Sequence, residues 1–219
     1  MTFSGFKKSR FILCEGDDDK GVLESLITVR NLPDFQVCHA AECNGGGPGG
    51  KTGFVKAIKG MEALSGFADL RALLIVADND TLATSFQDTQ TAFAENGHTP
   101  PANPNAVGNM QGKPVAIRMI PTTAVVGDLE ALCLPAIHAK WPLAQGCVTT
   151  FLECTGAVTW NKQSSINKAR ARAAAVGFYE PDPFKGIGHL FRNGTLSPLH
   201  ACFDDLALFL QNFDTMCGI

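Results

Sequence analysis

Two stretches of the chain are runs of apolar residues that each end in carboxylates. The first, residues 11–14, is followed by Glu15, a glycine and three aspartates. The second, residues 72–77, is followed by Asp78, an asparagine and Asp80. Unbroken apolar runs of this kind are typical of strands that are buried on both faces, as in the centre of a parallel sheet. The pattern therefore predicts two central strands with acidic carboxyl ends.

The remaining pattern alternates between helical and extended periodicity. Strands are predicted near residues 35–40 and 113–121, and a proline-rich and asparagine-rich exposed loop at 98–112. Residues 147–154 fit either a strand or a buried helix, and residues 181–194 are interpreted as a loop. Helices are predicted at 20–27, 83–95, 128–137, 164–175 and 199–213, with Pro135 expected to kink or end the third of these.

This alternation indicates an α/β protein with a parallel sheet of about four or five strands, flanked by helices. We expect a single domain over 1–219, with a core at about 8–137 and a helical C-terminal extension at about 138–219. The chain has 219 residues, of which 45% are hydrophobic and 18% charged, which suits a large buried core.

No segment approaches the ~20 apolar residues of a membrane span, and residues 1–10 are too polar for a signal peptide. We therefore expect a cytoplasmic protein without membrane contact.

The acidic strand ends suggest a metal site. Side chains alternate along a strand, so Asp78 and Asp80 should point the same way, roughly 6–7 Å apart. Together with Glu15 they would repel one another unless a cation neutralised them. Hard oxygen ligands favour Mg²⁺ or Mn²⁺. Asp17 and Asp18 are explained equally well as residues that cap the following helix and complement its dipole.

The Glu15-Gly16 strand end, followed by an acidic helix start, and the later Asp78-x-Asp80 strand end resemble the two signature motifs of the TOPRIM domain. This catalytic module occurs in topoisomerases, DnaG-type primases and OLD-family nucleases. The resemblance implies that Glu15 is a general acid or base and that Asp78 and Asp80 hold metal. With residues 120–121, 127–134 and 168–169, the chain is similar to a bacterial family of stand-alone TOPRIM-like proteins of unknown function.

The resemblance also extends the candidate site. Asp128 by itself is interpreted as a helix cap, and Glu130 as a solvated surface residue, but a comparable Asp-x-Glu contributes to metal binding in OLD-like nucleases. Lys168 and Arg172 fit either a solvated helix face or the wall of a phosphate-bearing crevice. In the second interpretation Lys168 steadies the charge that develops during the reaction and Arg172 contacts phosphate.

Residues 45–52 match the P-loop pattern of nucleotide-binding proteins, in which Lys51 would reach the terminal phosphates. A P-loop follows a buried strand directly, whereas the polar residues 41–44 separate these glycines from the preceding strand. The other interpretation is a glycine-rich connection at the acidic sheet edge, where Lys51 contacts a substrate phosphate without any nucleotide fold.

The function predicted from the sequence is Mg²⁺-dependent cleavage of phosphodiester bonds in nucleic acid, by a nuclease or phosphodiesterase. A metal-, phosphate- or nucleic-acid-binding protein without turnover is the first alternative, and a P-loop NTPase the second. The formal net charge of −3 argues against strong nonspecific adhesion to nucleic acid. Tyr179 is the only tyrosine and has no supporting motif, so strand passage by a topoisomerase mechanism is rejected.

Overall fold

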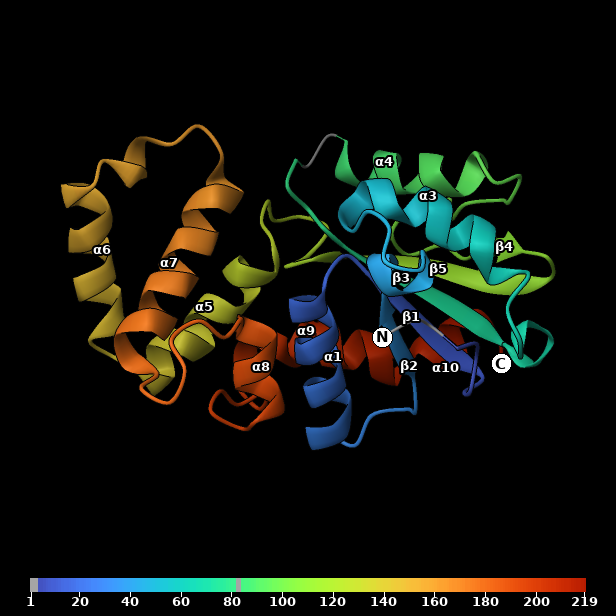
Figure 1. Ribbon diagram of the computed structural model, residues 1–219. Helices are drawn as coiled ribbons and strands as arrows, with labels where there is room; N and C mark the ends of the chain where they lie inside the picture. The colour runs from blue at the N-terminus through green and yellow to red at the C-terminus, as the bar shows by residue number, and fades with distance from the viewer. Residues whose placement is uncertain (1–3, 82–83) are drawn as a thin grey trace.

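The computed structural model describes residues 4–81 and 84–219, apart from the side chain of Lys51. A five-stranded sheet with the order β2-β1-β3-β5-β4 forms its centre, with helices on both faces (Figure 1). Four neighbouring strands are parallel, and the short edge strand β4 is antiparallel to β5. This arrangement confirms the predicted α/β fold class. The strands are β1 (Arg10–Cys14), β2 (Gln36–His39), β3 (Ala72–Asp78), β4 (Gly108–Met110) and β5 (Lys113–Ile120).

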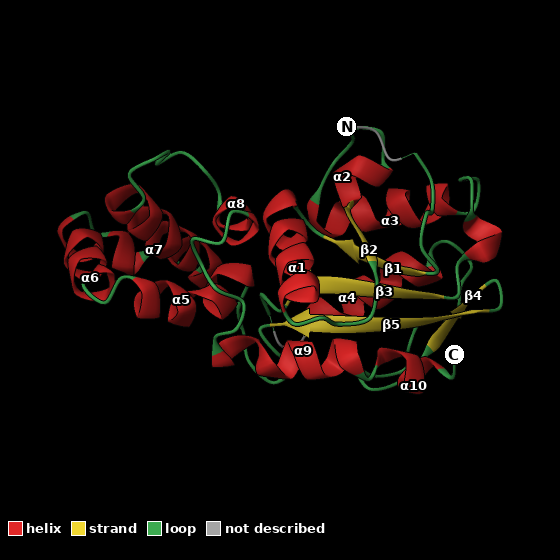
Figure 2. Cartoon of the chain, turned by 90° about the horizontal axis from the view of Figure 1, so that it is seen from below, coloured by secondary structure: helices red, strands yellow, loops and turns green. Residues whose placement is uncertain are grey.

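Alternate residues of the central strand enter two separate hydrophobic cores. Every residue of β3 is buried, which explains its unbroken apolar run. One core lies under α3 (Gly50–Met61) and α4 (Ser85–Ala94), and includes Leu73, Ile75 and Ala77. The other lies under α1 (Asp17–Val29), α9 (Asp204–Gln211) and α10 (Phe213–Cys217), and includes Leu74 and Val76. Figures 1 and 2 show these helices on opposite faces of the sheet.

A helical lobe lies beyond the carboxyl ends of the parallel strands (Figure 2). It is formed by α5 (Leu129–Lys140), α6 (Ala144–Cys154), α7 (Gln163–Phe178) and α8 (Ile187–Arg192). Its buried side chains belong to the same core as the α1 face of the sheet. The chain then returns to the sheet, where Asp205 of α9 pairs with Arg118 and Asp214 of α10 pairs with Arg10. In the described ranges, no helix has the length and apolar character needed to cross a membrane.

Several local predictions were wrong. Helix α5 does not end at Pro135 but continues to Lys140, because its neighbours Cys133 and Ile137 are buried in the core and hold the helix in place. The predicted loop at 98–112 contains strand β4, and the predicted loop at 181–194 contains helix α8. The helix predicted at 199–213 is divided into a short 3-10 turn, α9 and the start of α10. Of the two alternatives for residues 147–154, the helix is confirmed, within α6.

Candidate active site

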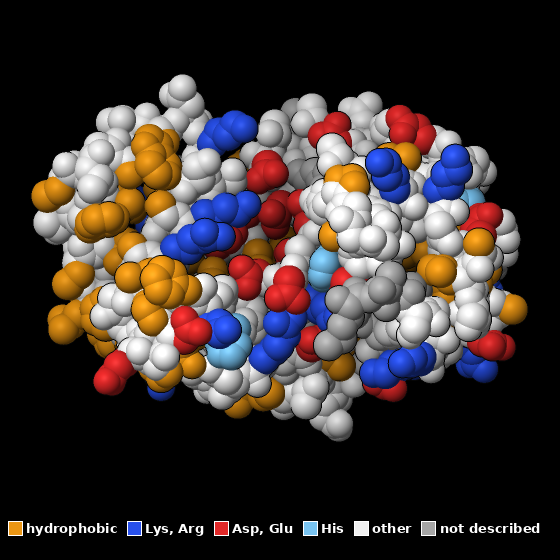
Figure 3. All heavy atoms as spheres, in the orientation of Figure 1, with side chains coloured by type: hydrophobic (Ala, Val, Ile, Leu, Met, Phe, Trp, Pro, Cys, Tyr) orange, Lys and Arg blue, Asp and Glu red, His pale blue; other side chains and the backbone are white. Residues whose placement is uncertain are grey.

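A cleft of about 520 Å³ opens where the sheet meets the helical lobe. In Figure 3 acidic side chains gather in the hollow between the two parts of the molecule, and basic side chains face them from the lobe. The wall combines the carboxyl ends of β1 and β3 with the first turns of α1, α3 and α5 and one face of α7. Its residues are Glu15, Gly16, Asp17, Asp18, Asp19, Gly50, Asp78, Leu129, Glu130, Lys168, Arg172 and Gly186.

Glu15 and Asp78 form the centre of the cleft. The Asp78 amide donates a hydrogen bond of 2.9 Å to Glu15 Oε1, and Asp78 Oδ1 accepts one of 3.0 Å from the Leu129 amide. The ends of β1 and β3 and the start of α5 are thereby joined. Burial raises the pKa of Asp78 well above its usual value, and the neighbouring carboxylates, Glu15 first, raise it further. The metal-free site therefore opposes ionisation of Asp78.

Asp19 is a site residue that the sequence analysis missed. It is 7% exposed, and its Oδ2 accepts a hydrogen bond of 2.9 Å from the Gly16 amide, which caps α1. Burial, followed by the charge of Glu15, raises the pKa of Asp19 to about 8. Asp19 lies three and four residues before Val22 and Leu23, on the buried stripe of α1. This helical spacing is the feature of the sequence that could have predicted its burial.

Glu130 lines the cleft at the start of α5, whereas Asp128, the N-cap of that helix, is fully buried and is not among the lining residues. Asp128 Oδ1 accepts hydrogen bonds from the Ala131 amide at 2.9 Å and from Asn167 Nδ2 at 3.1 Å, so the predicted cap is present. Its other oxygen, Oδ2, is buried and has no hydrogen-bond partner among the described residues. Glu130 is 7% exposed, and burial and Asp128 raise its pKa to about 7. The expectation that Glu130 lies on a solvated surface is wrong.

Two cations on α7 face these acids. Lys168 and Arg172 are one turn apart, exposed, and without a hydrogen bond or ion pair to the part of the chain that the structure describes. Partial burial acts to lower the pKa of Lys168, but the carboxylates, Glu130 and Asp78 first, raise it overall. Lys168 is therefore a stable positive charge, and both side chains remain available to an anion.

Asp80 is not part of the cleft wall. The regular strand ends at Asp78, and Asn79 forms an antiparallel bridge with Gly127 before the chain bends at Asp80. Asp80 is exposed at the rim, where its charge still contributes to the raised pKa of Asp78. Its role as a metal ligand stays a prediction.

The glycine-rich segment 45–52 borders the cleft. The Gly50 amide donates a hydrogen bond of 3.1 Å to the carbonyl of Glu15, and α3 begins at this residue. The short helix α2 (Ala40–Cys43) lies between β2 and the glycines, so this segment lacks the direct junction of a P-loop with its strand. The side chain of Lys51, expected to contact phosphate, lies outside the described residues.

Asn79 fixes the loop that carries α5 to the cleft. It is 2% exposed, and its Nδ2 donates hydrogen bonds of 3.0 Å to the carbonyls of Thr122 and Val125. We expect Asn79→Ala to lower the free energy of unfolding by about 2 kcal/mol, because the substitution removes the partly buried hydrogen bonds that hold the loop carbonyls. Urea unfolding measures this change, with exposed Asn161→Ala as the control. A loss equal to that of the control would contradict the assignment.

Within residues 4–81 and 84–219, no three His, Cys, Asp or Glu side chains are gathered closely enough to hold a metal ion unaided. A divalent cation in this cleft would therefore need oxygen ligands from water or substrate as well. Mg²⁺ binds in this manner, because it retains several waters and takes one or two carboxylates together with substrate phosphates.

The fold and the cleft define a three-layer α/β protein with an acidic crevice at the carboxyl ends of its parallel strands. Residues 9–213 match the model of DUF3226, described as a protein of unknown function, and the chain belongs to this family. No curated protein and no solved structure matches the chain.

Proposed function

We propose that the chain is a Mg²⁺- or Mn²⁺-dependent nuclease or phosphodiesterase, built on a TOPRIM-like domain, that cleaves nucleic acid. The main support is the composition of one cleft: Glu15, Asp78 and Glu130 face Lys168 and Arg172, two cations without an ion pair to any residue that the structure describes. Burial raises the pKa of Asp78 and of Glu130, so a bound cation would favour their ionised forms, and the cations of α7, which have no ion pair to the described residues, suit a phosphate. A cytoplasmic location belongs to the same proposal.

The residues present fit a hard divalent cation. All candidate ligands are carboxylate oxygens, the donors that Mg²⁺ and Mn²⁺ prefer. Asp128 Oδ2 is buried without a partner among the described residues, so a cation would satisfy an atom that is otherwise costly to bury. One or two of the carboxylates Glu15, Asp78, Asp128 and Glu130 would hold the ion together with water or substrate oxygens, with Asp80 at the rim. When bound, the ion supplies Lewis-acid polarisation of a phosphate oxygen.

The protein residues have separate roles in this proposal. Glu15 is held in place by the amide of Asp78, and its carboxylate takes the proton of the attacking water. Lys168 and Arg172 bind the phosphate and neutralise the charge that develops on it. The raised pKa of Lys168 keeps this ammonium charged throughout the neutral pH range.

A phosphate- or nucleic-acid-binding protein without turnover is the second candidate. The observation that favours it is the lack, among the described residues, of a group of side chains able to hold a metal without help. Both candidates use Lys168 and Arg172 to bind phosphate, so only a measurement of turnover distinguishes them.

Cleavage of labelled single-stranded and duplex oligonucleotides, with Mg²⁺, with Mn²⁺ and with EDTA, tests the proposal. We expect metal-dependent products and a fall of about 100-fold in kcat/KM for Lys168→Met, because a fixed charge near the transition state is lost. Lys162→Met, at the exposed start of the same helix, is the matched control. Binding without any metal-dependent product would reject the nuclease in favour of the second candidate.

A further inference from the structure

A second, smaller pocket opens directly from the cleft. Its volume is about 220 Å³, and it shares Asp18, Glu130, Arg172 and Gly186 with the cleft. We call it the side pocket. It lies between α7 and residues 183–187, so the helical lobe rather than the sheet supplies most of its wall. Any molecule bound across the phosphate site can extend into this space.

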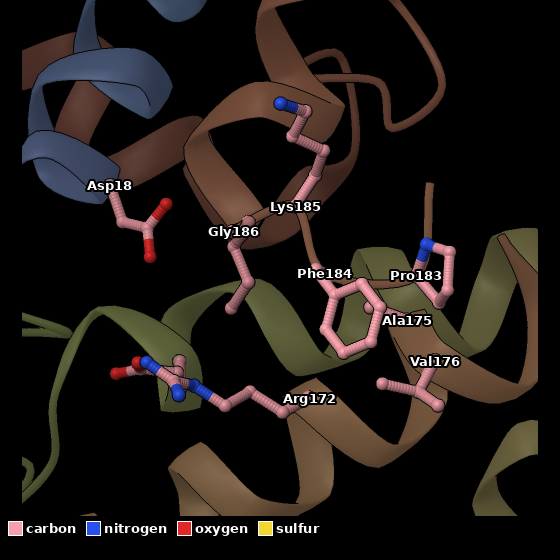
Figure 4. A pocket seen from close by; sticks show the side chains of 10 residues that line it. Asp18, Arg172, Ala175, Val176, Pro183, Phe184, Lys185 and Gly186 are labelled. Atoms are coloured by element: carbon pink, nitrogen blue, oxygen red, sulfur yellow. The ribbon is translucent and has the colours of Figure 1, made fainter. Parts of the chain in front are cut away.

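Phe184 is the most unusual feature of the side pocket. Its side chain is 94% exposed, more than any other large hydrophobic side chain that the structure describes. In Figure 4 the ring lies beside Pro183 and Ala175, and Asp18 points toward the pocket from the opposite side. A flat aromatic face is thus presented to solvent at the edge of a cavity, where its area is available to a ligand.

The segment that carries Phe184 is held in a defined conformation. Asp182 Oδ1 accepts a hydrogen bond of 3.1 Å from the Phe184 amide, and the Asp182 carbonyl accepts one of 3.2 Å from the Lys185 amide. Just beyond it, Asp18 Oδ1 accepts a hydrogen bond of 2.8 Å from the Gly188 amide. A Cβ atom at Gly188 would lie 2.7 Å from the Asp18 carbonyl oxygen, so only glycine permits this contact.

The side pocket has apolar surface beside the ring and charges of both signs at its edges. Ala175, Val176 and Pro183 provide the apolar surface. Asp18, Glu130 and Arg172 lie at the edge shared with the cleft, and Lys185, at the other edge, is paired with Asp182. A ligand that matches this arrangement has a flat ring system with an attached anion. A nucleotide within a nucleic-acid strand has both parts, because its base can stack on an aromatic side chain while its phosphate contacts Arg or Lys.

We propose that the side pocket binds an unpaired nucleobase, stacked on Phe184, from a nucleotide whose neighbouring phosphate lies in the cleft. The inference rests on the proposed function and specifies its substrate class as single-stranded or locally unpaired nucleic acid. In a duplex the same base is paired and stacked, so it reaches the pocket only after an extrusion that costs a few kcal/mol. Single strands avoid this cost.

Binding tests the proposal without requiring catalysis. Fluorescence anisotropy in EDTA would compare a labelled single-stranded oligonucleotide with its duplex, for the wild type and three variants. Phe184→Ala should weaken single-strand binding by roughly 5- to 100-fold, the range for loss of one stacked base. Phe184→Trp should retain binding, because it preserves an aromatic face. Phe151→Ala, an exposed phenylalanine on α6 outside both cavities, should behave as the wild type.

A base analogue identifies the stacked partner. 2-Aminopurine in a single strand should lose fluorescence on binding to the wild type and regain it with Phe184→Ala. An oligonucleotide with abasic positions should bind the wild type as weakly as the normal strand binds Phe184→Ala. Equal binding of normal and abasic strands by the wild type, or duplex binding as tight as single-strand binding, would overturn the proposal.

The two proposals fail in different ways. If Phe184-dependent binding is found but no metal-dependent product forms, the nuclease assignment fails and the stacking pocket stands. If products form at a rate that Phe184→Ala leaves unchanged on single strands, the nuclease assignment stands and the stacking pocket is rejected.

Discussion

Replacement of Asp78 by asparagine is expected to abolish metal-dependent stabilisation and phosphodiester cleavage while leaving the metal-free protein at least as stable as the wild type. An asparagine retains the oxygen that accepts the hydrogen bond from Leu129. It removes a charge that burial and the neighbouring carboxylates already oppose. The same substitution thus removes a cation ligand and relieves repulsion in the absence of the cation.

Thermal unfolding with and without Mn²⁺ measures both effects of Asp78→Asn. We expect a clear metal-dependent rise in Tm for the wild type and none for the variant, together with a loss of at least about 100-fold in kcat/KM. Asp88→Asn, an exposed aspartate on α4, is the control for a change of charge alone. A Tm increase of equal size in wild type and Asp78→Asn would remove Asp78 from the metal site.

In the metal-free protein, the free energy of unfolding is expected to fall as the pH rises from about 5 to 8. The pKa of Asp19 is about 8 and that of Glu130 about 7 in the folded state, against usual values of 3.8 and 4.5. Between these limits the native state binds more protons than the unfolded state, so a rise in pH favours unfolding. Full ionisation of Asp19 would cost several kcal/mol.

Urea unfolding in EDTA across this pH range tests that expectation. Asp19→Asn should flatten the decline, because the buried group no longer releases a proton, whereas exposed Asp69→Asn should leave it unchanged. Saturating Mn²⁺ should also reduce the slope, since a bound cation favours the ionised carboxylates. An Asp19→Asn variant whose stability declines with pH as steeply as the wild type would show that Asp19 ionises normally in the folded protein.

The sequence alone determined the central strands and the meeting of Glu15 with Asp78. An apolar run long enough for a buried strand is a local signal, and the carboxyl ends of parallel strands share one edge by topology. Both statements therefore follow without knowledge of distant contacts. The role of Asp128 as a helix cap could also be predicted from the sequence, because a cap depends only on residues within the next turn.

Only the tertiary structure decided which of the other acids are buried in the cleft. Asp19 and Glu130 owe their raised pKa values first to burial, which depends on neighbours that no local pattern specifies. The side pocket likewise forms because residues 183–187 pack beside Asp18, some 165 positions earlier in the chain, through a contact that requires glycine. Helix α5 continues past Pro135 for the same reason, since long-range core packing outweighs the local preference of a proline. Local patterns determine the elements and their ends, whereas desolvation is a property of the assembled chain.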